Sequence, residues 1–400
     1  MTTIRITRRT ALAWLATTLG ASATLAACGT GGPGSGTGVD ADRIVIGVHG
    51  PKSGPAAAFT EGATAGFRLY VDDINARGGI TGRKIEILEA DDQYTVSGGA
   101  AAARQMADKV FLAYNIIGAD PAIGALPEFE RQGTPYLTIA APLELAQDSD
   151  VAFIFPTPLE LLAEAVPSFI QTELDPQGTR TVGVMWENQD LMREMRDRFT
   201  AVAKEAGLDI VVTESFDRDA TSYVQNVKRV RDAGADLVVL LGGVAVPEVL
   251  KASETIGYDP MWTGAGAWTY DMINAASGGL MEGIRALRAG PAADAPDYEE
   301  FLARLHSTRD PSPTDELGYS GWAGAKFIEQ LLRRLDGDLT QQRLLEELES
   351  GTSKANPIRL DSLPPIWYGP DRRYGSDAAV PSTVRNGHWV ITGDPASRFE

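Results

Sequence analysis

The 400-residue sequence has few of the residues on which covalent cross-links and transition-metal sites depend. It contains one cysteine, Cys28, so no disulfide framework is available within the chain and stability must come from the size of the core. Its three histidines, His49, His306 and His388, lie far apart and show no ligand spacing. We therefore expect each histidine to be structural, and we predict no metal site and no cofactor.

Catalytic and phosphate-binding motifs are also missing. Ser53 lies in Lys-Ser-Gly rather than in a Gly-x-Ser-x-Gly nucleophile turn, and no Gly-Lys-Ser/Thr phosphate loop occurs. The adjacent pair Asp91-Asp92 would point to opposite faces of a strand, so we do not expect it to share a proton. The sequence thus gives no positive support for catalysis and favours a binding protein, with an enzyme of the cell envelope as the alternative from another class.

Basic charge and long apolar runs are scarce. The formal net charge is −18, from 36 Lys and Arg against 54 Asp and Glu. Such a surface repels nucleic acid and anionic lipid. No apolar run after residue 28 approaches the roughly 18 residues that a membrane-spanning helix needs. An apolar content of 44% is ordinary for a globular protein, and the length favours two domains over one.

The amino-terminal segment has the pattern of an export signal and is excluded from the fold. An arginine pair at positions 8 and 9 precedes a moderately apolar run, and small residues lead into Cys28. This resembles a lipoprotein signal, so we predict a signal peptide over 1–27, a lipid on Cys28 and a flexible linker over 28–40. The arginine pair favours twin-arginine export, although such pairs also serve the general pathway. A lone cysteine elsewhere is more often a buried apolar residue.

The stretch from Ile44 to Gln93 has the pattern of one βαβ unit. It opens with IVIGV, an apolar run of mostly β-branched residues that is typical of a strand covered on both faces. Phe67, Val71 and Ile74 then form the apolar stripe of a long helix, and a Gly-Gly pair at positions 78 and 79 ends it. A second strand follows at once, which predicts a right-handed parallel crossover.

Strand-like and helical patterns alternate through most of the chain. Further strands are predicted over 84–89, 114–117, 135–139, 181–185, 209–213, 236–241 and 261–263. Helices are predicted over 100–108, 159–174, 191–206, 223–233, 246–256, 297–306, 317–335 and 339–348. The last strands, over 380–385 and 388–391, form a hairpin around Asn386-Gly387. The fold class is therefore α/β, with mostly parallel sheets flanked by helices.

Three sequence segments, in the same order along the chain, resemble a known protein family. GPKSGPAAAF, VDDINARGGITGRKIEI and EADDQY are similar to the amino-terminal unit of the periplasmic solute-binding proteins for branched-chain amino acids and amides. The resemblance extends over about 44–389 and implies the type I binding-protein fold, in which two lobes are joined by three crossovers.

The resemblance also implies where the lobes divide. The crossovers would fall at Phe153–Pro158, at 284–291 and near Tyr368–Tyr374, where prolines and glycines interrupt the pattern. Lobe 1 would comprise residues 41–156 plus 288–370, and lobe 2 residues 157–287 plus 371–400. The helices between the second and third crossovers would return to lobe 1.

Ligands of open α/β sheets bind beyond the carboxyl ends of the strands, so the loops after the strands supply the candidate site. Helix N–H groups after Gly118 are placed to hold a carboxylate, although Asp120 is equally suited to capping that helix. Trp268, which follows a glycine-containing loop, is suited either to lining a ligand site or to covering the hydrophobic core. The candidate ligand-binding residues are Ser53, Phe59, Gln93, Asp120, Ala122, Ala140, Ala141, Trp186, Asp190, Leu191, Gly243, Val244, Ala265, Trp268 and Tyr319.

Several positions depart from the family pattern for amino-acid ligands. The hydroxyl side chains usual after the strands at 114–117 and 135–139 are replaced by alanines, and a usual Tyr-Gly pair is replaced by Leu191-Met192. The acid that usually meets the ligand ammonium is replaced by Ala265-Gly266. Loss of a buried charge partner costs roughly 3–5 kcal/mol, so we expect a small, partly apolar or aromatic ligand rather than a zwitterion held in the usual way. Asp120, Glu187 or Asp190 would replace the missing acid if the ligand is an amino acid.

The sequence therefore predicts an extracytoplasmic, lipid-anchored and monomeric solute-binding protein that delivers a small organic solute to the permease of an ABC importer by hinge closure. A branched-chain amino acid receptor with a rearranged site and a ligand sensor for a membrane receptor are the alternatives among binding proteins. We predict that the protein is not an enzyme and does not bind nucleic acid.

Overall fold

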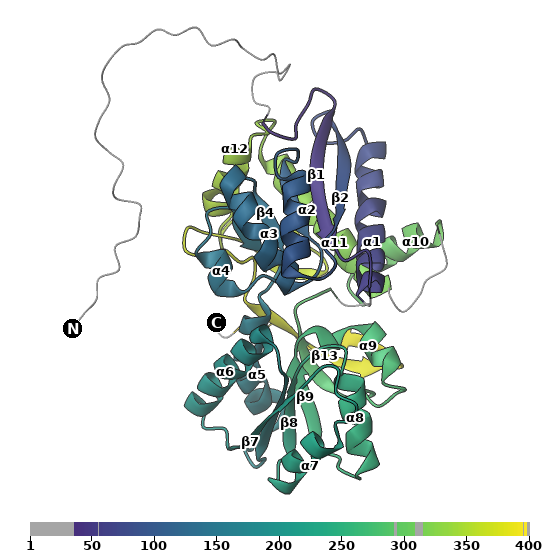
Figure 1. The fold of residues 1–400 in the computed structure, drawn as a ribbon, viewed down its shortest axis with the longest axis vertical. Helices are drawn as coiled ribbons and strands as arrows, with labels where there is room; N and C mark the ends of the chain where they lie inside the picture. The colour runs from purple at the N-terminus through teal and green to yellow at the C-terminus, as the bar shows by residue number, and fades with distance from the viewer. Residues whose placement is uncertain (1–35, 55, 292–293, 309–314, 395, 398–400) are drawn as a thin grey trace, which may run out of the picture. The chain divides into compact units, whose positions relative to one another are not determined.

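A computed structural model describes residues 36–54, 56–291, 294–308, 315–394 and 396–397. The predicted signal peptide, Cys28 and the linker up to residue 35 lie outside the described residues. Within them the chain forms two large, mostly parallel sheets flanked by helices (Figure 1), which confirms the predicted α/β class. None of the described helices has the length and apolar character that crossing a membrane requires.

The first sheet has five parallel strands in the order β2-β1-β3-β4-β5. The strands are β1 (Arg43–Gly50), β2 (Lys84–Asp91), β3 (Leu112–Asn115), β4 (Tyr136–Thr138) and β5 (Ala152–Ile154). The connecting helices are α1 (Ala57–Ala76), α2 (Val96–Met106), α3 (Ala119–Gln132) and α4 (Leu143–Gln147). Every residue of β1 except Arg43 is buried, so this strand is covered on both faces as its sequence predicts.

The second sheet has the order β14-β13-β10-β9-β8-β6-β7, with β15 paired to β13. Its parallel strands are β6 (Val182–Glu187), β7 (Ile210–Phe216), β8 (Leu237–Leu241), β9 (Met261–Ala265) and β10 (Arg285–Arg288). The antiparallel strands are β13 (Ala378–Arg385), β14 (His388–Ile391) and β15 (Ala396–Ser397). Helices α5 (Leu159–Phe169), α6 (Asp190–Glu205), α7 (Val224–Asp232), α8 (Val246–Thr255) and α9 (Asp271–Ala276) flank this sheet.

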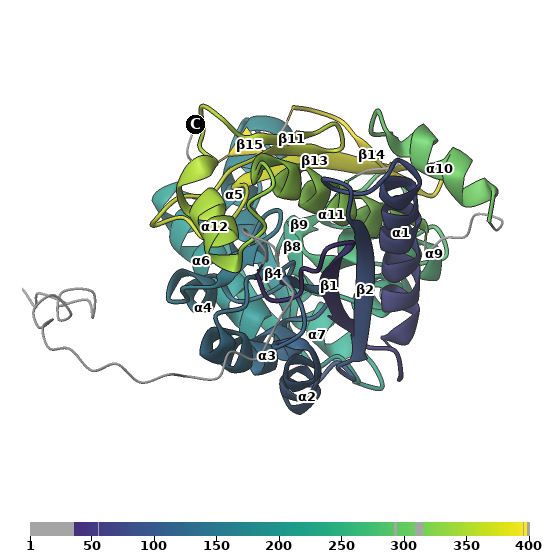
Figure 2. The ribbon, with the colours of Figure 1, turned by 90° about the horizontal axis from the view of Figure 1, so that it is seen from above.

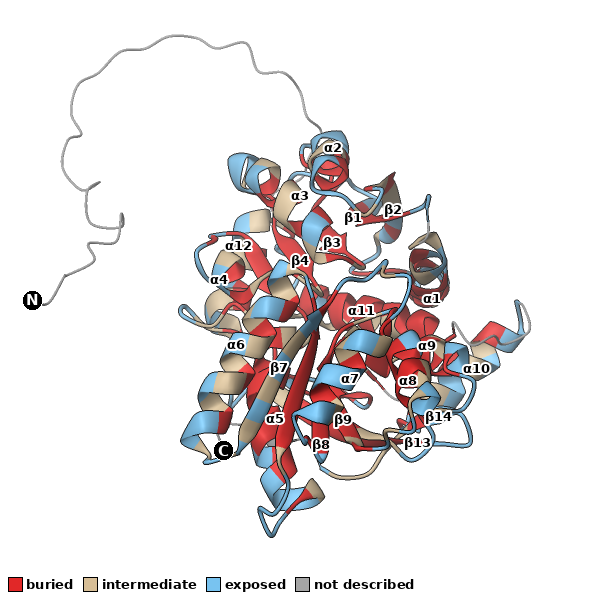
Figure 3. Ribbon diagram, turned by 60° about the horizontal axis from the view of Figure 1, so that its bottom comes forward, coloured by how far each residue is buried: buried red, intermediate tan, exposed pale blue. Residues whose placement is uncertain are grey.

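Edge and central strands of the second sheet differ in burial, as Figure 3 shows. All residues of β8 are buried, whereas burial alternates along β7 at the sheet edge. The predicted hairpin β13-β14 is confirmed, and Asn386-Gly387 at its turn has φ values of 52° and 81°. This is the left-handed conformation that a two-residue hairpin turn favours.

The segment between β10 and β13 returns to the first sheet. It contains α10 (Tyr298–His306), α11 (Asp315–Arg334), α12 (Gln341–Glu346) and a small antiparallel pair, β11 (Ile358–Leu360) and β12 (Leu363–Ile366). Buried residues of α10, α11 and α12 share one core with β1, β3 and α1. Figure 2 shows α11 beside α1. The chain therefore passes between the sheets after β5, after β10 and before β13.

The first and third of these passages run side by side. The backbone N–H of Ile154 donates to the carbonyl of Arg373 at 2.8 Å, and the N–H of Gly375 donates to the carbonyl of Ile154 at 3.0 Å. The hydroxyl of Thr157 donates to the carbonyl of Ala378 at 3.3 Å. These bonds join the two passages as a short ladder.

Two helix boundaries differ from the predicted ones for identifiable reasons. Helix α2 begins at Val96 rather than at residue 100, because the Thr95 hydroxyl accepts from the N–H of Gly98 at 2.9 Å and caps the helix earlier. The predicted helix over 159–174 is α-helical only to Phe169 and continues as one π-helical turn, Ile170–Leu174. The element types themselves are as predicted.

Glu160, in the first turn of α5, supplies a pH-dependent contact between α5 and α4. Its carboxylate is buried and accepts from the N–H of Leu143 at 2.9 Å. Burial raises the pKa of Glu160 to about 7, and nearby Glu194 acts in the same sense while Arg198 opposes it. The folded protein therefore binds this proton more tightly than the unfolded chain does. The contribution of Glu160 to stability is complete below about pH 4.5 and falls as the pH rises through about 7.

We expect Glu160→Gln to flatten the dependence of unfolding free energy on pH between 4.5 and 8, by an amount on the order of 3 kcal/mol at most. Glutamine keeps an oxygen for the Leu143 N–H, so the variant should exceed the natural protein in stability at pH 8. Urea unfolding at several pH values measures both effects. Exposed Glu144→Gln is the matched control and should keep the natural profile; an identical profile for the Glu160 variant would contradict the assignment.

Candidate functional site

The loops at the carboxyl ends of β1 and β2 are tied together by Asp91. Its carboxylate accepts from the N–H of Lys52 at 2.8 Å, the hydroxyl of Ser53 at 2.9 Å and the N–H of Gln93 at 2.9 Å. Burial acts in the opposite sense, but these hydrogen bonds lower the pKa of Asp91 and keep it ionised. Asp91 therefore positions the loop that contains the candidate Ser53.

The neighbouring Asp92 faces the other way and belongs to a buried network. His49 Nδ1 lies 2.9 Å from Asp92, and His49 Nε2 lies 2.9 Å from the hydroxyl of Tyr136. All three side chains are buried, and burial raises the pKa of Tyr136 well above its usual value. The network joins the ends of β1, β2 and β4, which agrees with the structural role predicted for His49. It also agrees with the opposite orientation predicted for the two aspartates.

Tyr94 follows this network in a backbone conformation that is uncommon outside glycine. Gln93 and Tyr94 have φ values of 54° and 58°, and the N–H of Tyr94 donates to Asp92 at 3.0 Å. The Tyr94 ring lies against Gly118, where an added Cβ would come within 2.8 Å of Tyr94 Cε2. Consecutive left-handed residues store strain of the kind that clusters at binding sites.

The electrostatic neighbours of Tyr94 come from both sheets. Burial raises the pKa of Tyr94, the charge of Arg218 opposes that shift, and the charges of Asp120 and Glu187 add to it. Tyr94 and Asp120 follow strands of the first sheet, whereas Glu187 and Arg218 belong to the second. The charges that act on Tyr94 thus come from residues at the strand ends of both sheets. We call Tyr94, Asp120, Glu187, Arg218 and Gly243 the strand-end cluster.

Glu187 is the buried anchor of the strand-end cluster. It is fully buried at the end of β6 and accepts from the N–H of Gly243 at 3.0 Å and from Arg218 Nε at 2.6 Å. The side-chain amide of Gln189 also donates to it. Because its oxygens are already bonded, Glu187 is poorly suited to replacing the acid missing at Ala265-Gly266.

Apolar side chains from both sheets also meet near these loops. Phe59 of α1, Tyr270 and Met272 pack against the core shared by the first sheet and α11, and equally against the core of the second sheet around α7 to α9. Burial raises the pKa of the Tyr270 phenol, and the charge of Arg288 opposes that shift. These three side chains thus form an apolar surface shared by the two cores.

The sequence-predicted site residues fall into distinct groups. Asp120 and Gly243 belong to the strand-end cluster, and Phe59 to the apolar surface shared by the two cores. The other candidates that are exposed or half-buried are Ser53, Gln93, Ala140, Asp190, Leu191 and Val244. The remaining candidates are buried: Ala122, Ala141, Trp186, Ala265, Trp268 and Tyr319.

Trp268 and Tyr319 lie in the core of this structure. Both are fully buried. Trp268 Nε1 donates to the carbonyl of Leu240 at 3.1 Å, and its ring packs edge-on against Trp389. The hydroxyl of Tyr319 donates to Asp297. Trp186 is likewise covered, since the guanidinium of Arg196 lies 4.5 Å from its ring centroid.

Sequence reasoning missed Tyr94 and Arg218. Tyr94 ends EADDQY, one of the three segments that carry the family resemblance, and it was not among the candidate site residues. Arg218 follows β7, and the rule that ligands bind after parallel strands would have included this loop. A cationic side chain two residues beyond a strand end was the available indication.

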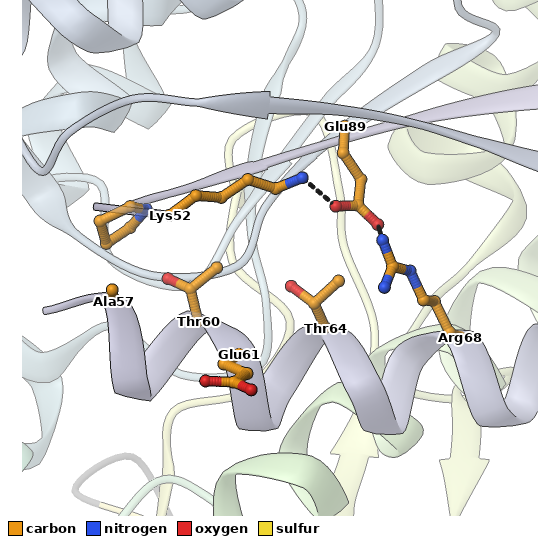
Figure 4. A pocket seen from close by; sticks show the side chains of 8 residues that line it. Lys52, Ala57, Thr60, Glu61, Thr64, Arg68 and Glu89 are labelled. Atoms are coloured by element: carbon orange, nitrogen blue, oxygen red, sulfur yellow. Dashed lines mark ion pairs between the residues drawn. The ribbon is translucent and has the colours of Figure 1, made fainter.

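A cavity of about 220 Å³ lies beside the Lys52 loop and shares no residue with the strand-end cluster. Figure 4 shows Thr60 and Thr64 projecting from α1 toward Lys52 and Glu89, and Glu89 pairs with both Lys52 and Arg68. The Thr60 hydroxyl is buried without a hydrogen-bond partner among the described residues. Within the same described ranges, no group of His, Cys, Asp and Glu has the arrangement of a metal site.

Comparison with known proteins identifies the family. A family model described as periplasmic binding protein matches residues 43–380, so the chain belongs to the periplasmic binding proteins. The Leu/Ile/Val-binding protein homolog 8 of Brucella abortus is 24% identical over 306 residues, which cover 72% of this chain and 75% of the relative. The chain is thus a solute-binding protein of the ABC-transporter type, and the resemblance seen in its sequence is confirmed. Members of this family are extracytoplasmic transport proteins rather than enzymes.

Solved structures agree on the fold. The fatty acid ABC transporter substrate-binding protein from Thermomonospora curvata is 17% identical, with a TM-score of 0.77 over 91% of this chain and 94% of that one. A solute-binding protein from R. palustris in complex with 4-hydroxybenzoate is 15% identical, with a TM-score of 0.74 over 88% and 96% of the two chains. Both likenesses establish the type I binding-protein fold.

Proposed function

We propose that the protein captures a small, partly apolar or aromatic organic solute between two lobes and delivers it to the permease of an ABC importer. The carrying observation is geometric: Glu187 at the end of β6 is hydrogen-bonded to Arg218 and Gly243, and Phe59, Tyr270 and Met272 pack against the cores of both sheets. A solute held there contacts both sheets at once, which is what favours a closed state.

The proposed lobes are residues 41–156 plus 288–370 and residues 157–287 plus 371–400. The division is supported by the separate sheets and by the passages of the chain between them. Hinge closure would concentrate in those passages, because they are the covalent connections. The proposed lipid on Cys28 would hold the protein at the outer face of the cytoplasmic membrane, and membrane fractionation of a Cys28→Ser variant tests this.

The solute is proposed not to be an α-amino acid held in the usual zwitterion mode. Ala265 is buried and Gly266 has no side chain, so the loop after β9 offers no carboxylate for an ammonium group. Glu187 is already hydrogen-bonded, as described above. The neighbours named for a fatty acid and for 4-hydroxybenzoate support a solute with a large apolar part.

A branched-chain amino acid receptor with a rearranged site is the second candidate. The names of the curated relatives favour it. Asp120 is exposed at the start of α3 and is the carboxylate of the strand-end cluster best placed to meet an ammonium group. This candidate requires the ammonium to lie against the first sheet rather than against the loop after β9.

We expect a thermal-shift and calorimetry screen of residues 36–400 to separate the two candidates. Medium-chain fatty acids or hydroxybenzoates should bind, and at a hundred times the Kd they should stabilise the fold by about 2.7 kcal/mol, a rise of several degrees in Tm. Leucine and valine should leave Tm unchanged. Micromolar binding of leucine or valine would instead favour the amino-acid receptor.

A further inference from the structure

The guanidinium of Arg218 uses only one of its nitrogens in a hydrogen bond to another described residue. It lies in the loop after β7, and its side chain is 44% exposed. Its Nε donates to Glu187 at 2.6 Å, and this is the hydrogen bond that the described part of the chain gives to its guanidinium. The terminal fork of two nitrogens, which matches the two oxygens of a carboxylate, is therefore left for another acceptor.

The buried side of Arg218 is held in a defined orientation. Glu187 cannot move freely, because it is fully buried and its second oxygen accepts from the N–H of Gly243 at 3.0 Å. A guanidinium fixed through Nε loses less rotational freedom when its fork binds a ligand. The geometry is that of a preorganised anion receptor rather than of a free surface arginine.

The guanidinium lies close to the end of the first sheet. Its charge acts on the phenol of Tyr94, which is held against Gly118 by two consecutive left-handed residues. The apolar residues Phe59 and Tyr270, which also follow strand ends, pack against the cores of both sheets. The loops after the strands thus supply both a cation and an apolar surface.

We propose that Arg218 binds a carboxylate of the solute, so that the transported compounds are carboxylic acids with an apolar or aromatic body. This inference rests on the proposed function and specifies its ligand class. A single negative charge fits better than a phosphate, because Asp217 and Asp219 flank Arg218 in the loop after β7 and would repel a dianion more strongly. The carboxylate is held from the second sheet, and the body of the solute lies against Phe59 and Tyr270.

The test compares acids with their neutral amides on residues 36–400. The pairs are 4-hydroxybenzoate with 4-hydroxybenzamide and octanoate with octanamide, measured by calorimetry at constant ionic strength. For at least one pair the natural protein should bind the acid tighter than the amide by about 10-fold or more. Arg218→Gln should weaken acid binding by about 10- to 100-fold and leave amide binding unchanged, and Arg218→Lys should retain part of the preference.

Two further variants separate recognition from folding. Arg218→Gln with Glu187→Gln avoids leaving a buried carboxylate without its partner, and it should show the same loss of acid preference. Arg229→Gln removes a comparable arginine that pairs with Glu214 of β7, and it should bind like the natural protein. Circular dichroism confirms that each variant is folded before binding is compared.

The results can separate failure of the proposed role of Arg218 from failure of the proposed solute class. Equal binding of acid and amide by the natural protein would overturn the role of Arg218 and leave the proposed function standing. An equal loss of acid and amide binding in Arg218→Gln would show that Arg218 only supports the fold of the site, which also overturns the inference. Absence of binding by both members of both pairs would overturn the inference together with the proposed solute class.

Discussion

Replacing Glu316 with alanine is expected to lower the free energy of unfolding by roughly 3–5 kcal/mol. Glu316, at the start of α11, pairs with Arg288 at the end of β10, and the two side chains are 3% and 1% exposed. Burial lowers the pKa of Arg288 to about 10 but leaves it charged at neutral pH. The pair joins the helices of the first sheet to the second sheet, so its loss would weaken that junction.

The loss of stability in Glu316→Ala comes from the buried polar groups that would lose their partner. Arg288 Nε and Nη1 have no hydrogen-bond partner among the described residues, and Glu316 is the carboxylate that pairs directly with this buried cation. Glu316 also accepts from the N–H of Asp271 at 2.6 Å. Removing the carboxylate would therefore leave both a buried charge and a buried N–H unpaired.

Urea unfolding measures this effect. Glu248→Ala, which removes an exposed partner of Lys251, is the matched control and should cost less than about 1 kcal/mol. A double variant, Arg288→Met with Glu316→Gln, removes both charges and keeps an acceptor for Asp271, so it should recover most of the stability. A loss below about 1 kcal/mol in Glu316→Ala would mean that water compensates Arg288.

Gly66→Ala is expected to destabilise the protein by about 3 kcal/mol or more, although alanine is the better helix former by about 1 kcal/mol. Helices α1 and α11 cross with their backbones in close approach (Figure 2). A Cβ on Gly66 would lie 1.7 Å from the carbonyl oxygen of Gly318, and one on Gly321 would lie 1.8 Å from that of Ala63. Because backbone atoms cannot rotate away as side chains do, the helices would have to separate.

The separation would disturb a large core. Phe67 and Trp322 are buried at this crossing and would lose contacts. Gly290→Ala is the control, because an added Cβ there meets nothing within 4 Å and the residue has no left-handed φ. Guanidinium unfolding should show a lower midpoint for Gly66→Ala and no change for Gly290→Ala; equal midpoints would contradict the close crossing.

The fold was largely predictable because its information is local. The buried run of β1, the stripe of Phe67, Val71 and Ile74 and the glycine stop after α1 are all as predicted. The alternation of strands and helices likewise predicted two mostly parallel sheets. The misplaced start of α2 arose from a threonine cap outside the apolar pattern.

The candidate site was less predictable because its residues come from distant parts of the chain. Trp268 has the same local pattern whether it lines a ligand site or fills a core, and its bond to Leu240 and its packing on Trp389 are visible only in the tertiary structure. Tyr94 and Arg218 carry no motif, and the charge of Arg218 acts on Tyr94 only in the folded chain. Their distance in sequence gives no indication of this.

The sequence by itself determined the α/β class and the family, since both depend on residue order and periodicity. It also showed that the loop after β9 lacks the acidic residue that usually meets the ammonium group of an amino-acid ligand. Only the tertiary structure decided that Glu187 is buried and already bonded, that the two terminal nitrogens of Arg218 have no hydrogen-bond partner among the described residues, and that two tryptophans are covered. The burial of a side chain and its hydrogen-bond partners are properties of the packed chain, because they depend on which strands and loops become neighbours when the chain folds.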